Sequence, residues 1–119
     1  MKKILTALVL ILSANQLMAE VPERYVRDVE KISNQYNTDL RTFLRSLSPQ
    51  TVQFDVQQQI QFCSIIKKYV DDIYKTTDEH RQYLPPSSMS VTKQSIIDKV
   101  MVSPEMQILK KYNIQCDLK

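Results

Sequence analysis

The sequence of 119 residues contains no glycine at all. Average composition would give about eight glycines in a chain of this length. Glycine supplies the positive φ angles of tight hairpin turns, the corners of bulged sheets and the close backbone approach of phosphate-binding loops. Its absence argues against all three and favours helices joined by turns that contain proline and serine.

Residues for metal or nucleophilic chemistry are also scarce. His80 is the only histidine, and no pair of cysteines or histidines has the spacing of a zinc or haem site. No nucleophile-elbow motif is present. Met89, Met101 and Met106 are widely spaced and lack accompanying histidines, which is typical of core methionines rather than copper ligands. The sequence therefore predicts a protein that is not an enzyme and that holds no cofactor and no metal.

Residues 1–19 have the organisation of a secretory signal peptide. A positive start at Lys2 and Lys3 precedes an apolar run at 4–12, and a polar stretch ends on the small residue Ala19. The apolar run covers about half of the roughly 20 residues that span a bilayer, so a retained membrane anchor is the weaker alternative. We expect cleavage after Ala19 and a periplasmic or secreted protein.

Removal of the signal peptide changes the charge of the chain. The whole sequence has a formal net charge of +3, but without Lys2 and Lys3 fourteen basic side chains face thirteen acidic ones. Charges of both signs are interleaved, and no cluster of four basic residues occurs. The sequence therefore predicts no binding to nucleic acid and no polybasic membrane patch.

The mature chain, residues 20–119, is long enough for one small domain with one core. Its two cysteines, Cys63 and Cys116, allow only one connectivity within the chain. A lone pair in an exported protein normally forms a disulfide, so we expect this bridge to join the tail to the middle of the chain. An intermolecular bridge and a reactive thiol are the alternatives.

Residues Pro22–Leu47 have the three-and-four spacing of a long amphipathic helix. Pro22 suits its first turn, and Ser48-Pro49 ends the run. The apolar positions form one stripe and the opposite side is polar, so this helix should pack on one side only. The stripe consists of Tyr25, Val26, Val29, Ile32, Tyr36, Leu40, Phe43, Leu44 and Leu47.

The next segment predicts a second long helix, from a Ser48 cap with Pro49 in the first turn to about Lys75. The alternation at 52–56 would also suit a short strand, but the helical period continues past it. Two apolar rows cover nearly half of the circumference, which is more than one neighbour can bury. The first row is Val52, Val56, Ile60, Cys63, Ile66, Val70 and Tyr74, and the second is Phe62, Ile65, Tyr69 and Ile73.

Shorter elements follow. Residues 76–84 extend the second helix or form a separate turn, and 85–88 (PPSS) is a linker. Ser90 can cap a helix through 91–102, and Ser103-Pro104-Glu105 can start another through 106–112. The predicted fold is all-α: a long antiparallel helical hairpin with two shorter C-terminal helices folded over the second row, and one disulfide.

The second row and the proline linker contain the candidate partner-binding residues. Aromatic residues beside a rigid proline loop suit a protein-binding anchor if they are exposed. Burial under the last two helices is the alternative. These candidates are Phe62, Ile65, Tyr69, Tyr83, Pro85 and Pro86.

The segment with Cys63, the stretch SVTKQSIIDKVMVSPE (90–105) and Cys116 resembles the periplasmic immunity proteins that neutralise type VI secreted amidase effectors. The resemblance covers residues 63–116 and implies an exported helical protein that binds a secreted effector. We expect a non-enzymatic protein-binding module of this kind, with another protein as its partner. A small envelope stress chaperone and a carrier of an apolar ligand are the alternatives.

Overall fold

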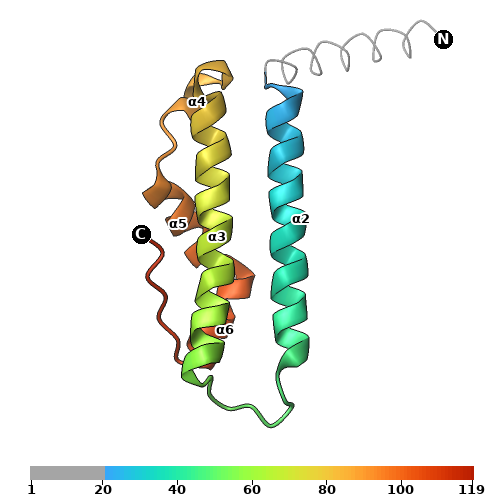
Figure 1. Cartoon of the computed structure of the whole chain (residues 1–119). Coiled ribbons are helices and arrows are strands. Elements are labelled where there is room, and N and C mark those ends of the chain that lie inside the picture. The colour runs from blue at the N-terminus through green and yellow to red at the C-terminus, as the bar shows by residue number, and fades with distance from the viewer. Residues whose placement is uncertain (1–20) are drawn as a thin grey trace, which may run out of the picture.

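A computed structural model describes residues 21–119, and the expected signal peptide (1–19) lies outside these residues. Two long antiparallel helices, α2 (Glu23–Ser46) and α3 (Val56–His80), stand side by side. Shorter helices and an extended tail gather around α3, as Figure 1 shows. The described residues contain no strand. The all-α prediction is confirmed, including the long hairpin and the short C-terminal helices.

Helix α2 matches its predicted bounds to within one residue at each end. Pro22 precedes its first turn, and the chain becomes extended at Leu47. Only the second half of the predicted apolar stripe is fully buried, at Tyr36, Leu40 and Phe43. In the first half of the stripe, Tyr25, Val29 and Ile32 are half-buried and Val26 is exposed.

Helix α3 begins seven residues later than predicted. Ser48 and Pro49 lie in a turn, and Asp55 is the N-cap. The Asp55 carboxylate accepts a hydrogen bond from the backbone N–H of Gln58 (2.7 Å), and the Gln58 side chain accepts one from the Asp55 N–H (2.9 Å). This capping box satisfies two N–H groups, whereas Ser48 caps no helix. Its hydroxyl instead donates to the side chain of Gln50.

Phe54 fixes the position of this late start. It is buried immediately before the cap, with its ring 5.4 Å from that of Phe43, 5.8 Å from that of Phe62 and 4.5 Å from that of Tyr112. One loop residue thus joins α2, α3 and the C-terminal part of the chain. The aromatic contacts hold Phe54 in the core, and the helix can begin only after it.

Beyond α3, both alternatives for residues 76–84 occur together. The helix continues to His80, and a 3₁₀ turn, η1 (Arg81–Tyr83), follows it. The linker then forms a short helix, α4 (Pro86–Met89). The Arg81 guanidinium donates to the backbone oxygens of Met89 (2.6 Å) and Val91 (2.9 Å), which ties the linker back to the end of α3.

Helix α5 (Lys93–Met101) is capped by Thr92 rather than by Ser90. The Thr92 hydroxyl accepts from the Ser95 N–H (3.1 Å), and the Ser95 hydroxyl accepts from the Thr92 N–H (2.9 Å). Ile96, Ile97 and Val100 are the buried residues of α5 and belong to the core that contains α3. Thr92 is the cap rather than Ser90 because its reciprocal pair with Ser95 satisfies two backbone donors at once.

The restart at Ser103 is a 3₁₀ turn, η2 (Pro104–Met106), followed by α6 (Gln107–Lys111). Ser103 does not cap it with its side chain, because the hydroxyl donates to the Val100 carbonyl (2.6 Å). Asn113 then adopts a φ of 53°, a left-handed conformation that asparagine tolerates, and turns the chain into the tail.

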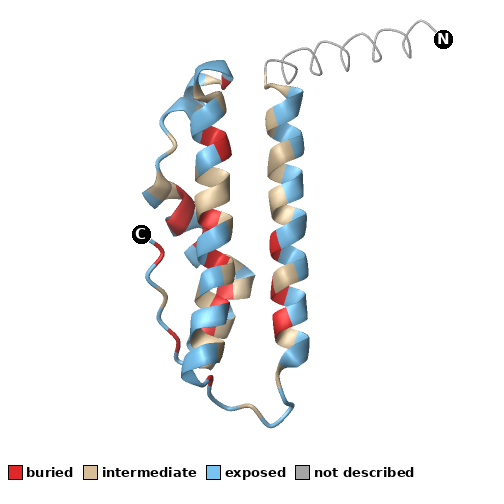
Figure 2. Cartoon of the chain, viewed as in Figure 1, coloured by how far each residue is buried: buried red, intermediate tan, exposed pale blue. Residues whose placement is uncertain are grey.

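The tail is held against α3 by the predicted disulfide. Cys63 and Cys116 are joined, with their Cα atoms 5.3 Å apart, and neither cysteine is free. Ile114 and Leu118, on either side of Cys116, are buried in the main core, and Figure 2 shows red positions along the otherwise exposed tail. The disulfide and two apolar anchors therefore keep the C-terminus packed.

Replacing Cys116 with serine should release this tail. A cross-link across 53 residues contributes about 4 kcal/mol on the chain-entropy model. We expect Cys116→Ser to melt well below the oxidised wild type and at the same temperature as the reduced wild type. Circular dichroism gives the melting temperatures. If the oxidised wild type and the variant melt at the same temperature, the disulfide does not stabilise the fold.

One core residue carries an unsatisfied polar group. Tyr36 on α2 is 9% exposed and stacks on Tyr69 of α3 with ring centroids 4.4 Å apart. Its hydroxyl has no hydrogen-bond partner. Burial, with smaller contributions from Glu105 and Tyr69, raises the pKa of Tyr36 from 10.0 to about 12. The folded state therefore favours the neutral phenol.

This pKa predicts an alkaline loss of stability. Between pH 10 and 12 the unfolded chain ionises Tyr36 while the folded chain keeps its proton, so stability falls as pH rises through this window. The slope approaches about 1.4 kcal/mol per pH unit. Urea unfolding at pH 9 to 11 should show a weaker pH dependence for Tyr36→Phe than for the wild type. Parallel profiles would contradict the raised pKa.

Candidate functional site

The predicted partner-binding residues do not form one surface. Phe62 is fully buried, and Ile65 and Tyr69 pack against the core, so the alternative of core packing holds for these three. Tyr83 is exposed, but it lies in η1 beyond the far end of α3. Pro85 and Pro86 flank it at the start of α4. Phe62, Ile65 and Tyr69 thus belong to the core, whereas Tyr83, Pro85 and Pro86 lie beyond the end of α3.

A different apolar surface is exposed at the start of α3. Val52, Val56 and Ile60 are 85%, 73% and 61% exposed. We expected them to continue the buried row that contains Cys63, but that expectation is wrong. The tail is fixed to α3 at Cys63, and the ion pair between Lys93 and Asp71 (2.9 Å) attaches α5 still further along the helix. Within the described residues, no segment covers the side of the two turns before Cys63 that carries Val56 and Ile60.

This surface has almost no charge. Between Ser46 and Ile66 the only charged side chain is Asp55, whose carboxylate is engaged in the capping box. We call the surface the exposed α3 face, and the start of α3 appears largely pale blue in Figure 2. Its apolar positions are accompanied by uncharged polar residues only. The face consists of Val56, Gln57, Ile60 and Ser64 of α3 together with Val52 of the loop that precedes the helix, and all five are exposed.

Directly behind the exposed α3 face the helix is rigidly packed. Phe62 and Ile66, on the opposite side of the same turns, are completely buried. Phe54 anchors the loop that carries Val52, and the Cys63–Cys116 disulfide fixes the next turn. The position of the face is therefore fixed by Phe54 near its start and by the disulfide of Cys63 near its end.

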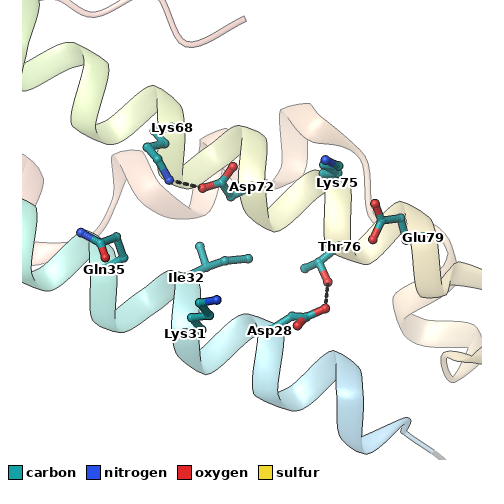
Figure 3. Close-up of a pocket in the computed structure, with 9 residues that line it drawn as sticks. All are labelled: Asp28, Lys31, Ile32, Gln35, Lys68, Asp72, Lys75, Thr76 and Glu79. Carbon is teal, nitrogen blue, oxygen red and sulfur yellow. Dashed lines mark hydrogen bonds and ion pairs between the residues drawn. The ribbon is translucent and has the colours of Figure 1, made fainter.

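A cleft of about 530 Å³ lies between the first half of α2 and the second half of α3. Figure 3 shows charged side chains from both helices around a single aliphatic residue, Ile32. The cleft arises because the helices meet here through polar side chains. Thr76 donates to Asp28 across the interface (3.2 Å). The lining residues are Asp28, Lys31, Ile32, Gln35, Lys68, Asp72, Lys75, Thr76 and Glu79.

The charges around this cleft are balanced and partly paired. Three lysines face three carboxylates, and Lys68 donates to Asp72 at 2.6 Å. The hydrogen bond to Asp72 raises the pKa of Lys68. This arrangement is typical of a solvated pair of helix faces, and one aliphatic residue gives an apolar ligand little to bind.

The residues that an acid–base mechanism would need are separately engaged. His80 Nδ1 lies 2.9 Å from the Thr76 carbonyl oxygen, and its ring packs near that of Tyr25. Asp71 pairs with Lys93, and Asp72 pairs with Lys68. Within residues 21–119 no group of three or more histidine, cysteine or acidic side chains could hold a metal ion. The described helices also include none with the length and apolarity needed to cross a membrane.

No protein-family model, curated protein or solved structure matches the chain. The exposed α3 face is therefore identified from its own geometry. Sequence periodicity predicted that its two valines and its isoleucine are buried, since they continue an apolar row. Periodicity identifies such a row, but it does not show which part of the row another segment covers. The available signal was the run of 21 residues, Ser46–Ile66, with one charge.

Proposed function

We propose that this chain is an exported, non-enzymatic protein-binding module that holds another protein on the exposed α3 face. The observation that carries the proposal is the combination of strong exposure and missing charge at Val52, Val56 and Ile60. The partner class we favour is a secreted antibacterial effector, which the module would neutralise as an immunity protein does.

The exposed α3 face has the composition that the centre of a protein interface requires. The buried centres of protein interfaces are depleted of charged residues, because an unpaired charge loses its hydration there. On a chain in which 24% of residues are charged, a stretch with one charge in 21 is unusual. Three exposed aliphatic side chains in that stretch can enter a partner's surface at little cost in polar desolvation.

The scaffold adds preorganisation. The exposed α3 face is backed by Phe62 and Ile66 and is bounded by the disulfide at Cys63, so it needs little ordering when a partner binds. A tight inhibitor benefits from such a rigid surface, because less conformational entropy is lost on association.

Export is supported by the signal-peptide pattern at 1–19 and by the disulfide, which is stable in an oxidising compartment. The effector-binding class is supported by the resemblance to immunity proteins over residues 63–116. The carrier alternative is less favoured, because the cleft between α2 and α3 is lined mainly by charged residues.

The proposal predicts that a charge in the exposed α3 face abolishes partner binding. Val56→Asp and Ile60→Asp should each weaken capture of the partner from non-reduced periplasm at least tenfold, since the carboxylate would be buried without a counter-charge. Val56 is the first residue of α3, where a negative charge is compatible with the helix dipole, so the variant should fold.

Val102→Asp is the matched control, because Val102 is 81% exposed and lies after α5, outside the face. Its capture should equal that of the wild type. Mass spectrometry of the captured proteins decides the class. One stoichiometric partner supports an inhibitor, many substoichiometric clients indicate a chaperone, and equal capture by all three variants would refute the assignment of the face.

A further inference from the structure

The extended tail, residues 113–119, resembles a β-strand that lacks a neighbouring strand. Its side chains alternate along the chain: Ile114, Cys116 and Leu118 are buried or half-buried, and the residues between them are exposed. This period of two is that of a strand, in which successive side chains point to opposite faces. The disulfide and the two buried side chains hold the tail in this form, so it needs little ordering before it pairs with another strand.

Two contacts show which edge of the tail faces α3. The Gln115 carbonyl oxygen lies 3.9 Å from Cys63 Sγ, and the Lys119 carbonyl oxygen accepts from Lys67 Nζ at 3.5 Å. In an extended chain the N–H and C=O of one residue point to the same edge, and those of the next residue point to the opposite edge. The backbone groups of the odd-numbered tail residues therefore face α3, and those of the even-numbered residues face away from it.

The edge that faces away from α3 is open. Figure 1 shows the tail at the margin of the molecule, beside α3, with no other segment on its outer side. Within residues 21–119, no hydrogen bond involves the Ile114 carbonyl, the N–H and C=O of Cys116, or the Leu118 N–H. The Ile114 N–H is already used, since it donates to the Leu109 carbonyl at 2.8 Å. Unpaired backbone groups along an extended edge are a template for another strand.

We propose that this edge pairs with the same edge of a second copy of the chain, antiparallel and about a twofold axis at Cys116. In an antiparallel ladder, two residues that form a hydrogen-bonded pair exchange both N–H···O=C bonds. Cys116 exchanges both bonds with the partner's Cys116, and the Leu118 N–H donates to the partner's Ile114 carbonyl. This register satisfies all of the open groups named above. Because the two edges are identical, the contact closes after two copies.

The exposed side chains of the tail are compatible with this register. Residues directly beside the central pair face each other across the strands, so Asp117 lies opposite the partner's Gln115. A register that places Asp117 opposite the partner's Asp117 would oppose two carboxylates, which destabilises an antiparallel pair. Charge therefore favours the pairing centred on Cys116. The contact uses no residue of the exposed α3 face, so it can be tested separately from the proposed function.

The dimer can be measured by sedimentation equilibrium of the oxidised mature protein. A contact limited to a few residues is small, so we expect a monomer–dimer equilibrium that is populated at about 1 mM. A protein that is entirely monomeric at about 1 mM would overturn the proposal. A strand of another protein bound to this edge, while the free chain stays monomeric, would also overturn it.

The charge at position 115 tests the register. Gln115→Lys places a cation opposite the partner's Asp117 and should strengthen dimerisation about threefold or more, while Gln115→Asp should weaken it by a similar factor. Gln115 is exposed, so both variants should fold. Asn34, exposed on α2, provides the matched controls: Asn34→Lys and Asn34→Asp change the net charge equally and should leave dimerisation unchanged. Equal dimerisation by the two variants at position 115 would contradict the register.

Semisynthesis at Cys116 tests the backbone pairing itself. A recombinant thioester of residues 20–115 can be ligated to a synthetic peptide of residues 116–119 and then oxidised. An ester in place of the Asp117–Leu118 amide removes the Leu118 N–H and keeps its buried side chain. Dimerisation should weaken about tenfold, because each copy loses one donor. An ester in place of the Leu118–Lys119 amide is the control, since the pairing uses neither the Leu118 carbonyl nor the Lys119 N–H. Equal dimerisation by the two esters would contradict the proposal.

Discussion

The fold depends on sealing the middle of α3. Phe62, Ile66 and Val70 are completely inaccessible, and one helix cannot achieve this alone. Helix α2 covers one side through Tyr36, Leu40 and Phe43, while the C-terminal segments cover another through residues such as Ile97. A domain of about 100 residues has little core to spare, so each covering layer matters. The disulfide holds the tail, which is the last of these layers, where Ile114 and Leu118 can be buried.

The same arrangement explains where the surface remains open. One side of the first two turns of α3 stays open, because Val56 and Ile60 are exposed there while Phe62 on the other side of the same turns is buried. At the other end, α2 meets α3 through hydrogen bonds of Thr76 to Asp28 and between Thr77 and Tyr25, and a charged cleft remains beside them. The two open regions therefore differ in chemistry: one is aliphatic and uncharged, and the other is charged and balanced. Only the first resembles the centre of a protein interface.

Much of the fold could be predicted from the sequence, because local sequence patterns determine it. The bounds of α2 follow from periodicity between two prolines, and the disulfide follows from a lone cysteine pair in a chain whose first residues have the pattern of a signal peptide. The starts of α3 and α5 were misplaced, because Ser48 and Ser90 look like caps as much as Asp55 and Thr92 do. Reciprocal capping boxes select Asp55 and Thr92, and the burial of Phe54 also fixes the start of α3. That burial depends on residues far from Phe54 in the sequence. The exposed face was missed for the same reason, since coverage of a helix is a tertiary property.

We propose that the exposed α3 face contacts another protein, while the rest of the scaffold holds this face in position. Site-specific photo-crosslinking in the cells that make the protein tests this most directly, with p-benzoylphenylalanine placed at position 60 or, for comparison, at position 102. We expect one defined crosslinked product from position 60 and none from position 102. No product from position 60, or the same products from both positions, would contradict it.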